Sequence, residues 1–105
     1  MEPYRIVLTT ASSMDEAKRM ARALVEERLA ACVNLAGDVE SVYRWQGAVE
    51  EAQEVLLLIK THVDKLEALE AAVLRLHSYA VPEFLVLEIN RGHSAYLKWL
   101  DESLE

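Results

Sequence analysis

Hydrophobic and polar positions follow two different periods along this chain. Runs of apolar and β-branched residues predict extended strands, whereas apolar residues spaced three or four positions apart predict helices. The first pattern predicts strands at residues 4–10, 30–45, 48–60 and 83–89, with a bend at Gly37-Asp38 in the second strand. The second pattern predicts helices at about residues 13–29, 61–76 and 95–103.

Polar residues before the helical segments fit N-cap positions. Ser13 and Glu16 match the capping box, in which each side chain bonds the backbone N–H of the other residue. Thr61 and Asp64 are the cap candidates for the second helix, and Ser94 is the candidate for the last. The inner face of the last helix is predicted to consist of Tyr96, Leu97, Leu100 and Leu104.

Gln46-Gly47 predicts a two-residue turn between the second and third strands. Tight hairpin turns need positive φ angles, which glycine adopts readily. This turn sets a register in which Trp45 pairs with Ala48, Arg44 with Val49, Tyr43 with Glu50, Ser41 with Ala52 and Val39 with Glu54.

The two halves of the third strand differ in polarity. Residues 55–59 are apolar on both faces and belong in a core, whereas residues 50–54 are mostly polar and should project beyond it. A lone two-stranded ribbon is marginally stable in water. The projecting arm, which carries Tyr43 and Trp45, is therefore expected to pack on another subunit.

The element order predicts an α+β fold, a ferredoxin-like βαββαβ sandwich with a long β-hairpin arm and a C-terminal helix, in one domain over residues 1–105. Adjacent apolar pairs such as Leu57-Leu58 and Val86-Leu87 point to both faces of the sheet. Two helices cover only one face. Exposure of the other would cost about 25 cal/mol per Å² of apolar surface, so it should meet the last helix or a neighbouring sheet.

Composition narrows the class of protein. The 105 residues are 52% hydrophobic and 28% charged, which suits one soluble globular domain. The net charge of -7 argues against nucleic acid as the main partner. No apolar run approaches the ~20 residues of a membrane span, and no secretory pattern opens the chain, so we expect a cytoplasmic protein without a membrane partner. The single Cys32 agrees with that compartment.

Cys32 and His77 are the softest candidate metal ligands, suited to copper or zinc. A small buried residue is the favoured interpretation of Cys32. His77 precedes a proline-bent loop that contains Tyr79 and Glu83. Two interpretations of His77 are equally favoured: it stabilises the helix C-terminus, or it converges with Tyr79 and Glu83 on a metal or another ligand. His62 and His93 lie near helix starts and are expected in solvent.

Five aromatic residues extend the set of candidate binding residues. Tyr43, Trp45, Tyr79, Tyr96 and Trp99 are candidates, with Lys60 and Glu83, to line a cleft between subunits. Interface packing and an ion pair remain the favoured alternative. The chain has only three glycines and no nucleophile, metalloprotease or phosphate-loop motif, so we predict no enzymatic activity.

Several motifs together resemble the CutA divalent-cation tolerance proteins. They are ERLAACVN at residues 27–34, SVYRWQG at 41–47, Glu54, Lys60-Thr61, HSYAVPE at 77–83 and YLKWL at 96–100. The resemblance covers residues 4–104 in the family's order and spacing. It implies a ferredoxin-like subunit, a homotrimer locked by hairpin arms, no established reaction, and a likeness to PII-type signalling trimers.

The resemblance also implies a link to metal, because the family name comes from a copper-tolerance phenotype. Some copper-binding members use a cysteine in the first strand and two adjacent histidines at a helix end. Here those positions hold Thr9 and His77-Ser78, which argues against a high-affinity soft-metal site. Two functions stay open: a trimeric metal-tolerance protein that binds copper or zinc weakly near His77 and Glu83, and a PII-like module that binds a metabolite or protein.

Overall fold

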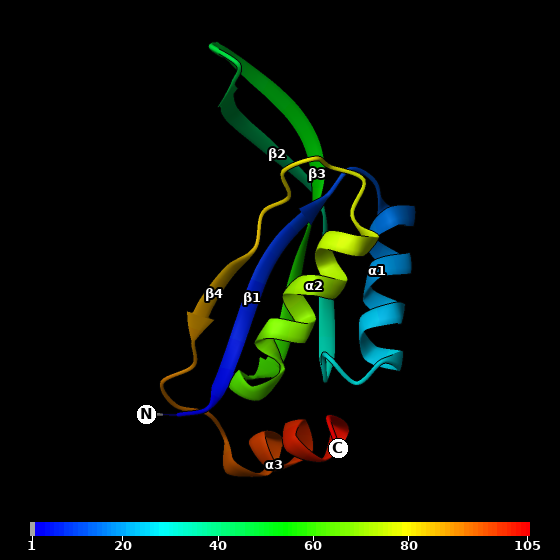
Figure 1. The fold of residues 1–105 in the computed structure, drawn as a ribbon. Helices are drawn as coiled ribbons and strands as arrows, with labels where there is room; N and C mark the ends of the chain where they lie inside the picture. The colour runs from blue at the N-terminus through cyan, green and yellow to red at the C-terminus, as the bar shows by residue number, and fades with distance from the viewer. Residues whose placement is uncertain (1) are drawn as a thin grey trace.

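The computed structural model describes residues 2–105 as a four-stranded antiparallel sheet with helices α1 and α2 on one face (Figure 1). The elements are β1 (Tyr4–Ala11), α1 (Met14–Glu26), β2 (Cys32–Trp45), β3 (Ala48–His62), the 3-10 turn η1 (Val63–Lys65), α2 (Leu66–Leu76), β4 (Leu85–Glu88) and α3 (Ser94–Ser103). The strand order is β2-β3-β1-β4. The predicted α+β class and element order are confirmed.

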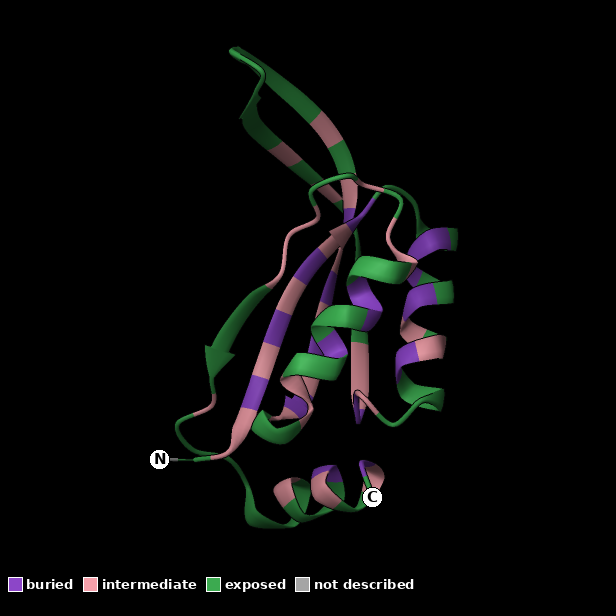
Figure 2. Cartoon of the chain, in the orientation of Figure 1, coloured by how far each residue is buried: buried purple, intermediate pink, exposed green. Residues whose placement is uncertain are grey.

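The β2–β3 hairpin has the predicted register. Trp45 pairs with Ala48, Tyr43 with Glu50 and Val39 with Glu54. Gln46 and Gly47 form the turn with φ angles of 51° and 84°, as a primed turn requires. The outer half of the hairpin extends past the helices and is mostly exposed (Figures 1 and 2).

A β-bulge lies at the predicted bend in β2. The pairing shifts between Ala36, which faces Leu56, and Val39, which faces Glu54. Asp38 takes a φ of 56°, a left-handed conformation that aspartate tolerates better than most residues. A Cβ at Gly37 would lie 3.1 Å from Met14 Cε, so glycine allows β2 to pass close to the start of α1.

The core lies between the sheet and the two helices. Val7, Leu57 and Ile59 alternate with less buried neighbours along β1 and β3, and they are fully buried. Met20 and Leu24 of α1, with Leu69 and Val73 of α2, complete this layer. Burial of each large side chain stabilises the fold by about 1.5–3 kcal/mol.

The opposite face of the sheet is only partly covered. We call Ile6, Leu8, Leu56, Leu58, Leu85 and Leu87 the open sheet face, because their strand positions place them away from α1 and α2. Leu85 and Leu87 are 56% and 49% exposed. Helix α3 packs at one end of the sheet, where Leu100 and Leu104 contact Ala31 and Tyr4. The prediction of strands that are apolar on both faces is confirmed.

Two of the predicted helix starts are wrong. Thr61 remains in β3, fully buried, and its Oγ1 donates to the Leu29 carbonyl oxygen over 2.8 Å. The turn before α2 is capped instead by His62, whose Nδ1 accepts the Asp64 N–H over 3.0 Å. Ser94 is the first residue of α3 rather than its cap, and His93 takes the cap position without a side-chain bond.

Two further boundaries differ from the predictions. Helix α1 ends at Glu26, because Arg28 adopts a φ of 60° and closes a Schellman motif in which the Leu29 N–H donates to the Leu24 carbonyl. Strand β4 begins at Leu85 rather than at residue 83. Tyr96 lies beside Lys60 of β3, on the predicted inner face of α3, but it remains partly exposed. None of the helices in residues 2–105 is long and apolar enough to cross a membrane.

Candidate functional site

A cleft opens where the hairpin leaves the helices, and we call it the hairpin cleft. Its volume is about 590 Å³, within the range of small-molecule sites. The loop between α2 and β4 passes beside the base of the hairpin and forms one wall (Figure 1). The lining residues are Thr10 of β1, Ser41, Val42, Tyr43 and Trp45 of β2, Glu50 and Glu54 of β3, and Tyr79, Ala80, Val81 and Glu83 of the loop.

His77 fixes the start of this loop. Its backbone leaves the helical conformation at φ -80° and ψ 143°, which ends α2. Its Nε2 donates to the Thr10 carbonyl oxygen over 2.6 Å, and its Nδ1 accepts the Tyr79 N–H over 3.0 Å. These two bonds place the ring proton on Nε2. Both nitrogens are therefore engaged, and His77 holds the loop against β1.

Glu16 is a second anchor for the same loop. Its side chain is 4% exposed, and its Oε2 accepts the Ser78 N–H over 2.9 Å. Its Oε1 accepts both the N–H and the hydroxyl of Ser12 over 2.9 Å. Burial would raise the pKa of Glu16, but the bonds from Ser78 and Ser12 outweigh it and lower the pKa to about 2.

The predicted capping box is therefore only half correct. Ser13 Oγ accepts the Glu16 N–H over 3.1 Å, as predicted. The Glu16 carboxylate does not complete the box, because it bonds Ser12 and Ser78 instead. A residue expected to cap one helix thus connects the start of α1 to the loop that follows α2.

Glu54 and Glu83 give the cleft its charge. Burial would raise the pKa of Glu54, but hydrogen bonds with Ser41, Tyr79 and Thr10 lower it overall. Tyr79 donates its hydroxyl to Glu54 Oε2 over 2.8 Å, and burial together with this bond raises the pKa of Tyr79. Burial, followed by repulsion from Glu54, raises the pKa of Glu83. The cleft therefore holds Glu54, whose ionised form is stabilised, beside Glu83, whose ionised form is destabilised.

Glu54 was not predicted as a site residue, although the alternation of side chains along β2 and β3 places it beside Tyr43 and Trp45. Glu54 pairs with Val39, and Tyr43 and Trp45 follow at even spacing on the same face of β2. Tyr43 and Trp45 are 41% and 44% exposed, so part of each side chain is accessible from the cleft side. Among residues 2–105, those that line the cleft include three glutamates and no basic side chain.

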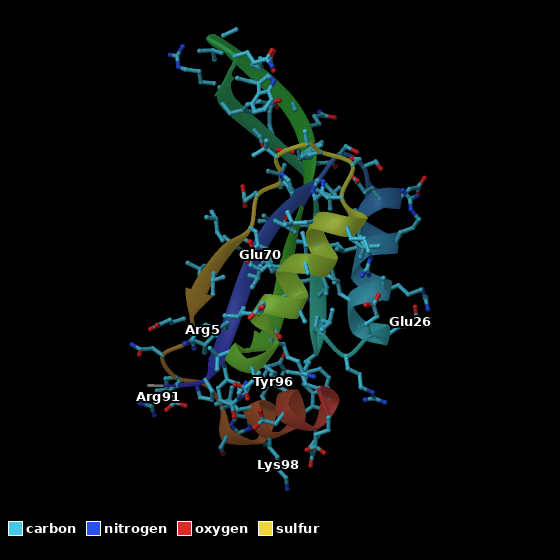
Figure 3. The ribbon with its side chains drawn as sticks, viewed as in Figure 1. Arg5, Glu26, Glu70, Arg91, Tyr96 and Lys98 are labelled. Carbon is cyan, nitrogen blue, oxygen red and sulfur yellow. The ribbon has the colours of Figure 1, made fainter. Side chains whose placement is uncertain are left out.

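The other predicted cleft residues lie at the opposite end of the sheet. Lys60 is about 20 Å further along β3 than Glu54, at about 3.3 Å per residue. Its Nζ lies 5.8 Å from the centroid of the Tyr96 ring, and Tyr96 stacks at a tilt on Trp99 at 5.3 Å. Figure 3 shows Tyr96 on the sheet side of α3 and Lys98 directed away from it. A single cleft from both groups would need two subunits and stays a prediction.

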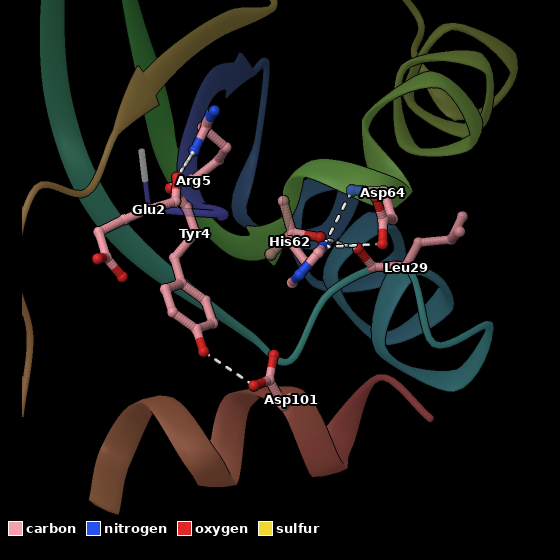
Figure 4. Close-up of polar contacts among 8 residues, drawn as sticks. Glu2, Tyr4, Arg5, Leu29, His62, Asp64 and Asp101 are labelled. Carbon is pink, nitrogen blue, oxygen red and sulfur yellow. Dashed lines mark hydrogen bonds and ion pairs between the residues drawn. The ribbon is translucent and has the colours of Figure 1, made fainter. Parts of the chain in front are cut away.

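Helix α3 is held in place by Tyr4. The Tyr4 hydroxyl donates to Asp101 Oδ2 over 2.8 Å (Figure 4). The Tyr4 ring also meets His62 edge-on at 5.9 Å, so His62 is packed rather than in solvent as predicted. His93 is exposed, as predicted. The α3 end of the sheet is thus closed by contacts within the chain.

Residues 2–105 do not form a ready copper or zinc centre. Both nitrogens of His77 already hold hydrogen bonds. Thr9 is fully buried on the helix side of β1, away from the cleft. Cys32, expected to be buried, is half-buried on β2 opposite Lys60. Within residues 2–105, no group of three His, Cys, Asp or Glu side chains is arranged to hold a metal ion.

Comparisons with known proteins agree on one family. A family model described as CutA1 divalent ion tolerance protein matches residues 5–103. The divalent-cation tolerance protein CutA of Thermus thermophilus is 50% identical over 98 residues, which are 93% of this chain and 95% of that protein.

Solved structures give the same result. The CutA1 structure from Thermus thermophilus has a TM-score of 0.94 at 48% identity, covering 97% of this chain and 99% of that one. CutA from Xylella fastidiosa has a TM-score of 0.96 at 35% identity, covering 98% and 99%. This chain belongs to the CutA1 divalent ion tolerance protein family.

Proposed function

We propose that this protein acts in tolerance to divalent metal ions, copper foremost, as a non-enzymatic homotrimer of the cytoplasm. In this proposal, the hairpin cleft binds cations weakly. The observation that carries it is the acidic cleft, lined by Glu50, Glu54 and Glu83, in a chain of the divalent ion tolerance family. The family is not one of known enzymes, and we assign no reaction to the cleft.

The open sheet face supports the trimer. Its leucines and isoleucine form a continuous apolar surface across β4, β1 and β3, because Leu8 pairs with both Leu58 and Leu85. Each Å² of such surface removed from water contributes about 25 cal/mol. The exposed outer half of the hairpin, with Tyr43 and Trp45, offers a second surface for a neighbouring subunit.

Carboxylate repulsion supports cation binding. A cation between Glu54 and Glu83 would relieve the repulsion that raises the pKa of Glu83. We expect weak affinity, because a soft metal prefers nitrogen and sulfur ligands, and His77 would have to release the Tyr79 N–H to supply one.

Isothermal titration with Cu²⁺ and Zn²⁺ tests the metal site, with the His77→Ala/Glu83→Ala double variant as the control. We expect a weak binding heat in the native protein and its loss in the variant. Equal heats from both proteins would contradict the site. Light scattering tests assembly separately, and a mass near that of one 11.9 kDa chain would contradict the trimer.

A second candidate function is a PII-like signalling or scaffold trimer that binds a small metabolite or a partner protein. The volume of about 590 Å³ and the open rings of Tyr43 and Trp45 favour this alternative, because a bare ion needs neither. A thermal-shift screen of metabolites and metals distinguishes the two, since only ligands that prefer the folded state raise the melting temperature.

A further inference from the structure

We infer that His62 is a pH-sensitive switch between the 3-10 turn η1 and helix α3. In this inference, the neutral ring caps η1, whereas the protonated ring releases the cap and pairs with carboxylates at the α3 end of the sheet. The inference is independent of the proposed function, because it concerns the end of the sheet opposite the hairpin cleft. Every contact that carries it lies within one chain.

The cap of η1 depends on an unprotonated ring nitrogen. His62 Nδ1 accepts the Asp64 N–H over 3.0 Å (Figure 4). A ring nitrogen accepts a hydrogen bond only where it carries no proton, so the proton of the neutral ring lies on Nε2. A second proton must enter at Nδ1, and the Asp64 N–H then loses its acceptor. Histidine is the side chain that ordinarily makes this change between about pH 5 and 8.

The protonated ring has carboxylates within reach. Asp64 Oδ2 lies 3.5 Å from His62 Nδ1, and the Asp64 side chain is 83% exposed and therefore free to turn. A small cavity of about 130 Å³ lies beside the ring, and Asp101 and Glu105 line it together with Asp64 and one base, Lys65. An imidazolium is attracted by this excess of negative charge, whereas a neutral ring gains nothing from it.

The switch reaches α3 through Tyr4. The Tyr4 ring meets the His62 ring edge-on with 5.9 Å between centroids, and its hydroxyl donates to Asp101 Oδ2 over 2.8 Å. Tyr4 also packs against the apolar cluster that contains Leu104. A ring that turns from Asp64 toward Asp101 or Glu105 therefore changes the contacts of α3 itself.

The charged and titratable groups around the ring come from four parts of the chain. Lys60 precedes His62 by two positions on the same face of β3. The other groups are Tyr4 of β1, Asp64 and Lys65 of η1, Asp101 of α3 and the C-terminal Glu105. Only Lys60 and Lys65 oppose a positive ring, and the Lys60 ammonium lies toward the Tyr96 ring at 5.8 Å. The acids therefore set the response to protonation.

The test follows the native protein by NMR from about pH 8 to pH 5. We expect the neutral His62 ring to carry its proton on Nε2. Hydrogen exchange of the Asp64 amide, relative to its intrinsic rate at each pH, should rise about fivefold as the ring becomes protonated, because one capping bond is lost. The Leu104 methyl signals should shift with the same midpoint. A neutral ring protonated at Nδ1, or Asp64 exchange that does not follow the ring, would overturn the inference.

Two matched variants assign the change to one histidine. His62→Asn keeps a side-chain acceptor for the Asp64 N–H, because asparagine is a preferred N-cap, but it cannot titrate. It should keep Asp64 protected and the Leu104 signals fixed over the same pH range. His93→Asn removes an exposed histidine that also precedes a helix but makes no side-chain cap bond, so both changes should remain. A Leu104 shift that persists in His62→Asn, or disappears in His93→Asn, would overturn the inference.

A third variant tests the α3 side of the switch. Asp101→Asn/Glu105→Gln removes two negative charges beside the ring and keeps an oxygen that accepts the Tyr4 hydroxyl. The pH-dependent shift of Leu104 should shrink, whereas the loss of Asp64 protection should remain. A Leu104 shift equal to that of the native protein would show that the ring does not turn to α3 and would overturn the inference.

Light scattering over the same pH range separates the switch from subunit association. We expect a constant mass, because the contacts that change lie within one chain. A mass that changes with the same midpoint as the NMR signals would assign those signals to association, and would overturn the inference.

Discussion

The two ends of the sheet carry similar kinds of side chain but differ in how many of these side chains contact a partner within the chain. At the α3 end, Lys60 lies over Tyr96, and Tyr4 bonds Asp101. At the hairpin end, Tyr43 and Trp45 are 41% and 44% exposed, and no Lys or Arg of the described residues lines the cleft with its glutamates. The first end has the contacts of a structural junction, whereas the second combines partly exposed rings with Glu83, whose ionised form is disfavoured.

The largest loss of stability is expected from a substitution at the α3 end of the sheet. Leu100→Ala removes a fully buried side chain that packs with Ala31, Leu104 and Tyr4. It should lower the free energy of unfolding by about 2–5 kcal/mol, as measured by urea denaturation. Val49→Ala in the exposed outer hairpin is the control and should cost less than about 0.5 kcal/mol. A Leu100→Ala protein of native stability would show that α3 does not hold this end together.

The next largest effect is expected from Glu16, which anchors the loop at the hairpin end and makes stability depend on pH. Its pKa falls from an ordinary 4.5 to about 2, so its contribution to stability is complete above about pH 4.5 and is lost as the pH falls toward 2. The shift corresponds to about 3 kcal/mol at neutral pH. Glu16→Gln should therefore destabilise the protein at pH 7 and flatten its stability profile between pH 2 and 5. Parallel profiles for the two proteins would refute this role.

A matched pair of tyrosine variants compares the two ends directly. Tyr4→Phe removes the bond to Asp101, and Tyr79→Phe removes the bond to Glu54. Each should cost about 1–2 kcal/mol in urea denaturation, because a carboxylate loses a donor. Tyr79→Phe should also raise the pKa of Glu54, observed by NMR titration of its carboxyl carbon. An unchanged Glu54 titration would mean that Ser41 and Thr10 suffice.

The smallest expected effect concerns Lys60. Lys60→Met keeps the aliphatic stem but removes the ammonium that lies 5.8 Å from the Tyr96 ring. The free energy of unfolding should fall by about 0.5–1 kcal/mol, as expected for a partly exposed cation–π contact. A larger loss would indicate a buried ion pair with a carboxylate of another subunit, and would join the two ends of the sheet across an interface.

Local patterns predicted the sheet well. Gln46-Gly47 predicted the turn and register, and Gly37-Asp38 predicted the bend, because backbone conformation at these positions depends on nearby residues.

Thr61 was assigned to a helix start because threonine often caps helices, but its β-branched side chain suits β3, where it pairs with Arg5.

Contacts between distant segments were beyond these patterns. The bond from Ser78 to Glu16 and the bond from His77 to the Thr10 carbonyl join residues more than 60 positions apart. A capping motif or a helix-end histidine looks the same in sequence whichever distant partner it has. The acidic cleft depends on such contacts, because the loop that forms its wall is fixed to β1 and α1 only in the folded chain.

The bulge at Asp38 reconciles two registers within β2. Before it, odd-numbered residues of β2 such as Val33 and Leu35 pack toward the helices. After it, the parity reverses, and Tyr43 and Trp45 share a face with Glu54 of β3. A chain shortened by one residue here would lose the bulge but keep Val39 opposite Glu54, because the Gln46-Gly47 turn fixes the outer pairing and the inner pairing differs from it by one residue. The extra residue therefore lets β2 direct odd-numbered side chains toward the helices in its inner half and to the opposite face in its outer half.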